Sequence, residues 1–137
     1  MTSTVTYHGG LRTTCTHVKS GSSFETDAPT DNHGKGERFS PTDLMATSLA
    51  TCMITVMGIK ARSMNFDLDG IKIDMVKIMK NEPRRVGGIE LTFHIPDTLK
   101  NIDVSSIELL KDVGIHCPVQ LSIHPDIDVR IDWGAWG

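Results

Sequence analysis

The sequence predicts a mixed α+β fold from the order of its patterned segments. Short segments with period-two alternation come first, and a long apolar segment with helical features follows. Two more alternating segments, a second helix and a closing strand complete the chain. The length of 137 residues indicates a single domain over residues 1–137. Such a domain has much surface for its volume, so dimerisation would help to stabilise it.

The first 39 residues predict two or three strands followed by a loop. Gly9-Gly10 is a turn signal, and alternation follows it over residues 11–19. A short strand is expected at Phe24–Thr26. Residues 28–39 are rich in Pro, Asp, Asn, Gly and Lys, which indicates a loop long enough to have a function as well as to connect.

A long helix is predicted from Pro41 to about Ser63. Ser40 is expected as the N-cap, with Pro41 as the first helical residue and Asp43 completing a capping box. The helix is apolar on nearly every face, and such a helix is normally buried all round. Since one domain of this size could hardly enclose it, a second subunit is expected to cover it.

The second half of the chain predicts a hairpin. Residues 71–78 alternate with a change of phase, which indicates a strand with a bulge near Met75. Residues 89–95 alternate strictly, and residues 81–88 are expected to join the two strands as a loop.

After the hairpin we expect a helix and a closing strand. Asp103 is the predicted cap of a helix that ends near Val113, with Gly114 at its C′ position. Residues 118–124 are a possible short helix and residues 127–131 a strand. The last residues, with Trp133 and Trp136, resemble an exposed tail that covers either the dimer or a neighbouring groove.

Composition excludes several classes of function. The net charge is −3 and the densest basic pair is Arg84-Arg85, so the chain lacks the basic face that nucleic acid requires. The N-terminus has no signal-peptide pattern. The longest uncharged stretch, residues 44–59, is too short and contains too many hydroxyl groups for a membrane span. Three cysteines are too few for a disulfide framework, which predicts reduced thiols and a cytoplasmic protein.

Two of the cysteines are candidates for redox chemistry. Cys117 precedes Pro118 at the expected start of a short helix, where N–H donors would stabilise a thiolate and lower its pKa. His116 could add positive charge; a small N-cap or core residue is the alternative. Cys52 lies mid-helix, where apolar surroundings would raise its pKa, and by itself it is more typical of packing. If the fold brings both together, one thiolate can attack a substrate and the other can close a disulfide.

Activation of Cys52 would require a basic partner supplied by the fold. The candidates are Arg12, after the Gly9-Gly10 turn, and Arg38, in the loop before the long helix. Local sequence alone favours an ordinary solvated surface arginine at both positions. Asp43 could orient an arginine, although the capping box alone explains it, and Cys15 is compatible with packing on its strand.

Metal binding and hydrolysis are the competing uses of cysteine and histidine. Neither is predicted, because the soft ligands lack the paired spacing of a zinc site and no nucleophile-elbow signature is present. These possible ligands are Cys15, His17, His116, Cys117 and His124.

Two motifs resemble those of a known family. Residues 36–53 resemble the central-helix motif of the OsmC/Ohr family, the osmotically inducible and organic hydroperoxide resistance proteins, and residues 116–119 (His-Cys-Pro-Val) resemble its second cysteine motif. The resemblance implies an OsmC-like fold: an intertwined homodimer with long buried central helices flanked by antiparallel sheets. It also implies that Cys52 is the peroxidatic thiol and Cys117 the resolving one, whereas local sequence favours Cys117 as the more acidic thiol.

The function implied by this resemblance is a cytoplasmic thiol-dependent peroxidase. It would reduce organic or inorganic hydroperoxides through a Cys52 sulfenate and a Cys52–Cys117 disulfide, using a thiol or dithiol reductant and no cofactor. One position departs from the organic-hydroperoxide branch: Thr42 replaces a glutamate that pairs there with the activating arginine, so the chain is more similar to the OsmC-like branch. The alternative is a non-catalytic protein of the same fold that binds a small apolar ligand.

Overall fold

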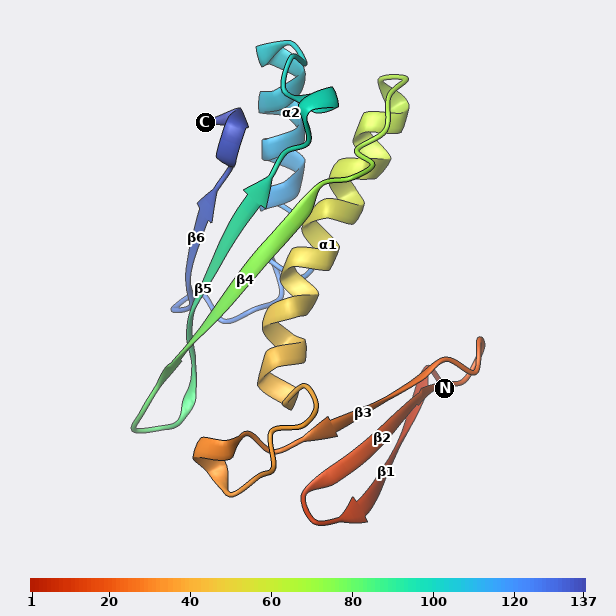
Figure 1. The fold of residues 1–137 in the computed structure, drawn as a ribbon, viewed down its shortest axis with the longest axis vertical. Helices are drawn as coiled ribbons and strands as arrows, with labels where there is room; N and C mark the ends of the chain where they lie inside the picture. Colours follow the sequence, from red (N-terminus) through yellow and green to blue (C-terminus); the bar gives the residue numbers. More distant parts are fainter. The chain divides into compact units, whose positions relative to one another are not determined.

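The computed structural model describes residues 1–137 and confirms the mixed α+β class. The chain forms two compact units, Met1–Met45 and Ala46–Gly137, and each is described by itself (Figure 1). The boundary between the units falls within the first turns of the long helix. A single domain over residues 1–137 therefore stays a prediction.

The first unit contains the predicted three-stranded antiparallel sheet. Its strands, in sheet order, are β1 (Ser3–Gly9), β2 (Arg12–His17) and β3 (Ser23–Asp27). Gly9 and Gly10 turn the chain between β1 and β2 with φ angles of 80° and 60°. Glycine adopts these left-handed angles without a steric penalty, which explains the pair at this turn. The loop that follows contains a short 3₁₀ helix, Thr30–Asn32.

The long helix α1 (Pro41–Ser63) has the predicted bounds and the predicted start. The backbone N–H of Asp43 donates to Ser40 Oγ at 3.0 Å, and the backbone N–H of Ser40 donates to Asp43 Oδ2 at 2.9 Å. This reciprocal pair is a capping box, and it satisfies two backbone donors that the helix itself leaves without partners.

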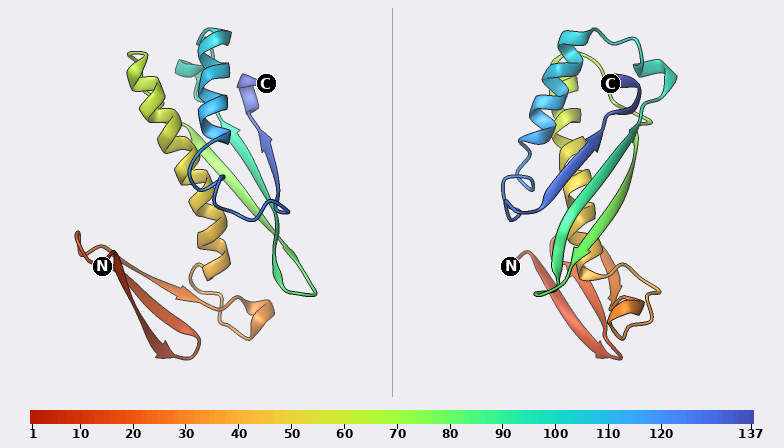
Figure 2. Two further views of the ribbon diagram at one scale, coloured as in Figure 1. Left: turned by 180° about the vertical axis from the view of Figure 1, so that it is seen from behind. Right: turned by 90° about the vertical axis from the view of Figure 1, so that its left-hand side faces the viewer.

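The second unit contains a three-stranded mixed sheet in the order β4 (Lys72–Lys80), β5 (Arg85–His94) and β6 (Asp128–Asp132). β4 and β5 are antiparallel, whereas β6 runs parallel to β5, so this sheet is not wholly antiparallel. A parallel neighbour requires a crossover, and α2 (Val104–Ile115) lies within it. Figures 1 and 2 show α1 and α2 along the same face of the sheet.

The core of the second unit lies between this sheet and the two helices. Ile89, Leu91 and Phe93 of the central strand β5 have at most 1% of their surface exposed. Leu110 of α2 is fully buried. α1 contributes one face to the core, made of Ala46, Leu49, Ala50, Met53, Met57 and Ala61. The alternation that predicted β5 therefore identified its buried face correctly.

The single chain buries one face of α1 and leaves another exposed, so burial on every side by a second subunit stays a prediction. Thr51, Thr55 and Ile59 are exposed, and Ile59 has 66% of its surface accessible. The reason is geometric, because one sheet and one helix cover only part of a helical cylinder. By length and composition alone, α1 could also cross a membrane, and in this structure one of its faces packs in the core of the second unit.

Three details differ from expectation in the second unit. The register of the hairpin shifts between Ile78 and Met79 rather than near Met75. β5 begins at Arg85, so the joining loop is shorter than predicted. Residues 118–124 form hydrogen-bonded turns and no helix, with the N–H groups of Ser122 and Ile123 donating to the same carbonyl, that of Val119.

The C-terminal tryptophans are anchored to their own unit. Trp136 lies in a 3₁₀ helix, Gly134–Trp136, where it is buried and donates through Nε1 to the Leu99 carbonyl at 2.9 Å. The Trp133 ring lies 4.7 Å from the Phe93 ring, measured between centroids. The expected exposed tail is therefore wrong, since both rings pack against residues far away in the sequence.

Candidate functional site: the cysteine pair

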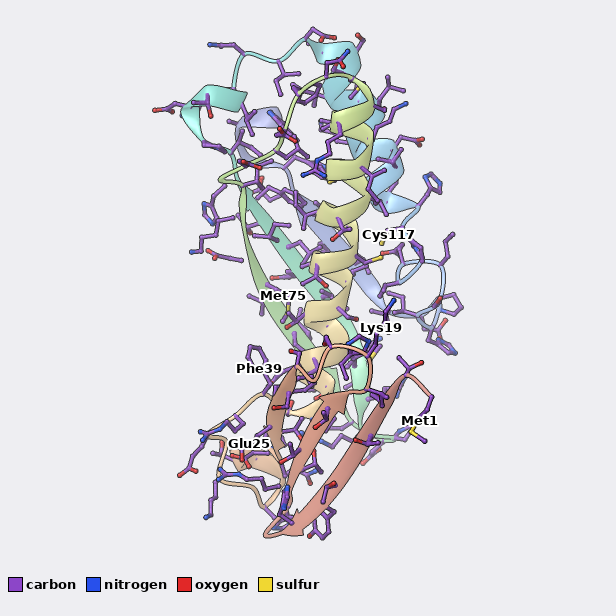
Figure 3. The ribbon with its side chains drawn as sticks, turned by 90° about the vertical axis from the view of Figure 1, so that its right-hand side faces the viewer. Met1, Lys19, Glu25, Phe39, Met75 and Cys117 are labelled. Atoms are coloured by element: carbon purple, nitrogen blue, oxygen red, sulfur yellow. The ribbon has the colours of Figure 1, made fainter.

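The second unit brings Cys52 and Cys117 together. Cys52 lies in the middle of α1, and Cys117 follows the end of α2. The Cys52 thiol lies close enough to Cys117 to raise the pKa of the Cys117 thiol. Figure 3 shows the sulfur of Cys117 beside α1. Two cysteines that are far apart in the sequence are thus neighbours in the second unit.

Gly114 explains how the end of α2 reaches α1. A Cβ atom at this position would lie 3.0 Å from Met57 Sδ and 3.1 Å from Met53 Cγ, which is closer than side chains normally pack. The backbone N–H of Cys117 then donates to the Gly114 carbonyl at 3.1 Å. The glycine is thus needed for a close approach of two helices, and it lies inside α2 rather than at the predicted C′ position.

The environment of Cys117 favours the neutral thiol. Its residue surface is 1% exposed, and this burial raises the pKa of the Cys117 thiol above its ordinary value. The neighbouring Cys52 thiol raises this pKa further, while the N–H groups of Gln120 and Val119 partly offset the effect. The Gln120 nitrogen lies 3.5 Å from Cys117 Sγ. The expected low pKa is wrong, because turns replace the helix and desolvation dominates.

Cys52 differs from Cys117 in exposure. It is half-buried, and both residues are free thiols in this structure. A reagent in solution therefore has more access to Cys52 than to Cys117. This asymmetry suits a pair in which one thiol meets the substrate and the other reacts only with its neighbour.

Arg12 lies in the first unit and binds two carboxylates. Its Nε donates to Asp27 Oδ1 at 2.7 Å, and its Nη2 donates to Asp27 Oδ2 and Glu37 Oε2, both at 2.8 Å. The Arg12 guanidinium lowers the pKa of the Asp27 carboxyl, and the hydrogen bonds that Arg12 donates to Asp27 and Glu37 raise the pKa of Arg12 well above its ordinary value. The guanidinium is therefore a fixed, permanently charged group.

Arg38 is more exposed and has one carboxylate partner. Its Nε donates to Glu25 Oε2 at 2.9 Å, and its Nη1 donates to the Glu37 carbonyl at 3.0 Å. Both candidate arginines belong to the first unit and both cysteines to the second. Activation of Cys52 by either arginine therefore stays a prediction.

The remaining candidates have structural partners. Cys15 lies in register between Val5 and Phe24 in the first sheet. His116 Nδ1 lies 2.8 Å from the Asp112 carbonyl of its own helix. Asp43 belongs to the capping box already described. No three histidine, cysteine or acidic side chains gather as a possible metal site.

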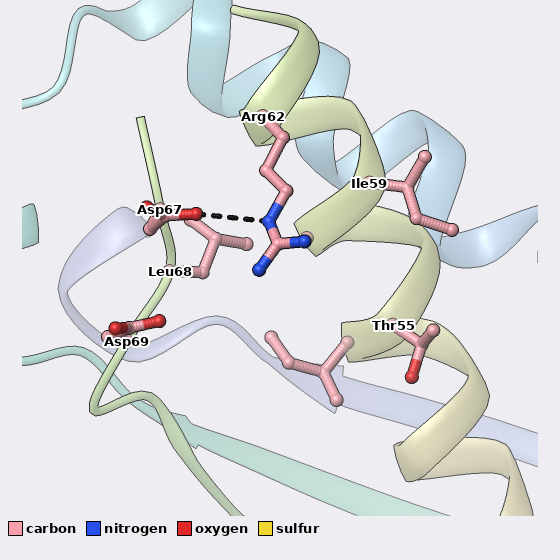
Figure 4. A pocket seen from close by; sticks show the side chains of 8 residues that line it. Thr55, Ile59, Arg62, Asp67, Leu68 and Asp69 are labelled. Atoms are coloured by element: carbon pink, nitrogen blue, oxygen red, sulfur yellow. Dashed lines mark hydrogen bonds and ion pairs between the residues drawn. The ribbon is translucent and has the colours of Figure 1, made fainter. Parts of the chain in front are cut away.

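Two surface hollows flank the exposed face of α1. One, of about 340 Å³, lies between α1 and the loop before β4, with the Arg62–Asp67 ion pair at its edge (Figure 4). The other, of about 230 Å³, is lined by residues of α1 and by Ile71, Ile73 and Met75. Neither of these hollows is lined by a cysteine.

Three residues of interest were missed by the sequence analysis. Asp27 and Glu37 both bind Arg12. Asp27 ends a strand and Glu37 lies in the following loop, and nothing in the sequence indicates that both carboxylates meet the same guanidinium. Gln120 follows Cys117 by one turn, and its side-chain Oε1 is buried without a hydrogen-bond partner. Nothing in the sequence distinguishes Gln120 from any other glutamine in a turn.

Comparisons with known proteins agree with this architecture. The sequence matches the OsmC-like protein family over residues 34–132, a range that contains both cysteines. No curated protein sequence matches. A solved structure from Psychrobacter arcticus 273-4, described as a candidate osmotic stress induced and detoxification response protein, is 45% identical, with 96% of this chain and 94% of that chain covered and a TM-score of 0.90.

More distant solved structures share the fold. An organic hydroperoxide resistance protein OsmC from Legionella pneumophila is 19% identical, with 96% of each chain covered and a TM-score of 0.72. The organic hydroperoxide resistance protein OhrB of Bacillus subtilis is 20% identical, with 96% and 97% covered and a TM-score of 0.68. The family match and the fold together establish that this chain belongs to the OsmC-like protein family.

Proposed function

We propose that the chain is a cytoplasmic, thiol-dependent peroxidase in which Cys52 attacks the hydroperoxide and Cys117 resolves the product. The observation that carries this proposal is that a half-buried thiol and a buried thiol are neighbours in the second unit. Membership of a family that includes hydroperoxide resistance proteins also supports it. Burial disfavours the thiolate of Cys117, so Cys52 is the better candidate for the attacking group.

The reaction requires two steps and an external reductant. The Cys52 thiolate attacks the distal peroxide oxygen; an S–O bond forms, the O–O bond breaks, and the departing alkoxide takes a proton to become an alcohol or water. The resulting sulfenic acid then reacts with the Cys117 thiol, forming an S–S bond and releasing water. A thiol or dithiol in solution reduces this disulfide and returns both cysteines to the thiol state.

A cation near Cys52 would favour the reactive thiolate. We assign this role to Arg12, with Arg38 as the alternative, because a guanidinium keeps its charge at every physiological pH. The strong ion pairs of Arg12 support the choice, since they hold the group in one position.

The proposed functional form is a homodimer. Support comes from Ile59, which is exposed on α1, and from the apolar hollow that α1 forms with Ile71, Ile73 and Met75. An exposed apolar face on a central helix is typical of a protein–protein contact. Sedimentation of the purified protein should give twice the mass of one chain, and a monomer at micromolar concentration would contradict this part of the proposal.

The alternative function is non-catalytic binding of a small apolar ligand. The hollow lined by Ile54, Ile71, Ile73 and Met75 is the feature that favours it. This hollow is separate from the cysteines, so a binding protein would tolerate their replacement. The two functions therefore make opposite predictions for the same variants.

The test is turnover of a hydroperoxide with dithiothreitol as the reductant. We expect Cys52→Ser to abolish turnover, and Cys117→Ser to allow one sulfenate-forming event but impair repeated cycles. Cys15→Ser is the matched control and should keep wild-type activity, because Cys15 packs within the first sheet. Full activity of Cys52→Ser would refute the assignment of roles.

A further inference from the structure

Lys111 of α2 has a largely buried charge that the proposed reaction does not use. Only 14% of its side chain is exposed, and a lysine ammonium is seldom buried unless partners compensate its charge. Its Nζ donates to the Trp136 carbonyl at 2.9 Å, to Glu108 Oε1 at 3.1 Å and to the main-chain oxygen of Gly137 at 3.2 Å. These three acceptors match the three N–H donors of an ammonium group. Two of them belong to residues 133–137, here called the C-terminal segment.

The C-terminal segment is itself anchored in the second unit. Trp136 donates through Nε1 to the Leu99 carbonyl, and the Trp133 ring packs against Phe93 of β5. Gly134 has a φ angle of 58°, and a Cβ atom there would collide with the Phe93 carbonyl oxygen, so the chain passes close to β5. Figures 1 and 2 show the end of the chain beside α2. The acceptors of the ammonium therefore belong to a fixed part of the fold.

α2 is held on two different sides. Leu110 and Gly114 are four residues apart and share a face; Leu110 is fully buried, and Gly114 lies against Met53 and Met57 of α1. Methionine side chains adapt easily, so this face alone restrains rotation of the helix only weakly. Lys111 follows Leu110 by one residue, which places it about 100° further round the helix. Its contacts to the C-terminal segment therefore restrain the rotation that the first face leaves free.

The position of Cys117 depends on how α2 is held. Cys117 follows Lys111 by six residues, and its N–H donates to the carbonyl of Gly114 in the last turn of α2. Its own carbonyl accepts from the N–H of Leu121, which ties the following turn to the same point. A rotation of α2 would therefore displace Cys117 relative to Cys52 of α1.

We propose that Lys111 is a positioning residue for Cys117: it ties α2 to the C-terminal segment and so holds the resolving thiol beside Cys52. This inference rests on the proposed function. In the step concerned, the Cys117 thiol attacks the Cys52 sulfenic acid; an S–S bond forms, the S–O bond breaks, and the hydroxyl group leaves with the thiol proton as water. The rate depends on how well the two groups are oriented, so a loosened α2 slows it. The first step, at Cys52 alone, does not involve α2.

The experiment measures how the Cys52 sulfenic acid divides between Cys117 and dimedone, a reagent that traps sulfenic acids. The protein receives one equivalent of hydrogen peroxide in a fixed excess of dimedone, and peptide mass spectrometry gives the ratio of Cys52–Cys117 disulfide to Cys52–dimedone adduct. We expect Lys111→Met to lower this ratio about tenfold, because methionine keeps an apolar stem but donates no hydrogen bond. The rate of peroxide consumption in the first turnover should stay at the wild-type value. An unchanged ratio would overturn the proposal.

Three variants separate position from general stability. Glu108→Gln changes only the exposed acceptor and should keep the wild-type ratio. Lys111→Arg keeps the charge and the donors and should restore most of the ratio; a ratio as low as that of Lys111→Met would contradict the proposal. Val86→Ala removes buried apolar volume from β5 at its hairpin end, so it should lower Tm but leave the ratio unchanged. If Val86→Ala lowers the ratio as far as Lys111→Met does, lost stability explains the effect and the proposal is wrong.

A further variant covers the case in which Lys111→Met does not fold. Lys111→Gln keeps an amide donor for one of the carbonyls and should still lower the ratio, whereas a wild-type ratio would overturn the proposal.

The proposed function and this inference fail in distinguishable ways. If the wild-type protein forms neither the disulfide nor the dimedone adduct at Cys52, the proposed function itself is wrong. If the wild type closes the disulfide and the Lys111 variants close it equally well, the peroxidase assignment survives and only the role of Lys111 is rejected.

Discussion

Replacement of Gly114 by alanine adds one methyl group where α2 packs against α1. The new Cβ would lie 3.0 Å from Met57 Sδ and 3.1 Å from Met53 Cγ, and both methionines are fully buried. Overpacking of a core by one carbon typically costs about 1–3 kcal/mol. Alanine in a helix gains up to about 1 kcal/mol over glycine. The net expectation is a loss of about 1 kcal/mol in the free energy of unfolding.

Urea denaturation at a fixed protein concentration measures this loss. For a slope of about 2 kcal/mol per molar urea, the midpoint should fall by about 0.5 M. The same displacement moves Cys117, whose backbone bonds the Gly114 carbonyl, so formation of the Cys52–Cys117 disulfide should also slow. Met57→Ala supplies the control. In that background the added methyl no longer meets the Met57 side chain, although Met53 Cγ stays close, so Gly114→Ala should destabilise the protein less than it does in the wild type. A Gly114→Ala variant that is more stable than wild type would refute the packing argument.

Two other predictions concern stability. The hydroxyl and N–H groups of Ser105 and Ser106 lower the pKa of the Asp103 carboxyl from 3.8 to about 2, so its contribution to stability is complete above about pH 4 and is lost as the pH falls through about 2. The difference in Tm between wild type and Asp103→Asn should therefore be constant above pH 4 and shrink towards pH 2; a difference that stays constant down to pH 2 would contradict the linkage. Trp136→Phe removes the donor to the buried Leu99 carbonyl and should cost about 1–2 kcal/mol in urea unfolding, whereas an unchanged midpoint would show that this hydrogen bond adds nothing.

Local patterns in the sequence were sufficient for most of the elements. The Ser40–Asp43 capping box and the alternation in β5 were predicted correctly because neighbouring residues alone determine them. The parallel pairing of β6 and the position of Gly114 inside α2 were not predicted. Both depend on which distant segment packs alongside, and period and propensity contain no such information.

The candidate site, like the fold, was predicted only in part from the sequence. The motifs predicted that Cys52 and Cys117 act together; the two residues are neighbours in the second unit, and their roles stay a prediction. The acidity of Cys117 was predicted in the wrong direction, because a local argument from a helix terminus cannot include burial by α1. The contact between Asp27 and Arg12 was missed for a related reason. It forms because the register of β2 and β3 places the two residues opposite each other, and the sequence does not show this register.

Intact mass after one equivalent of hydroperoxide tests the central claim most directly. The protein without reductant should lose two hydrogens, and peptide mapping should find Cys52 joined to Cys117 while Cys15 stays a free thiol. A mass that stays unchanged, or that rises by scattered oxygen additions with no Cys52–Cys117 peptide, would contradict the account.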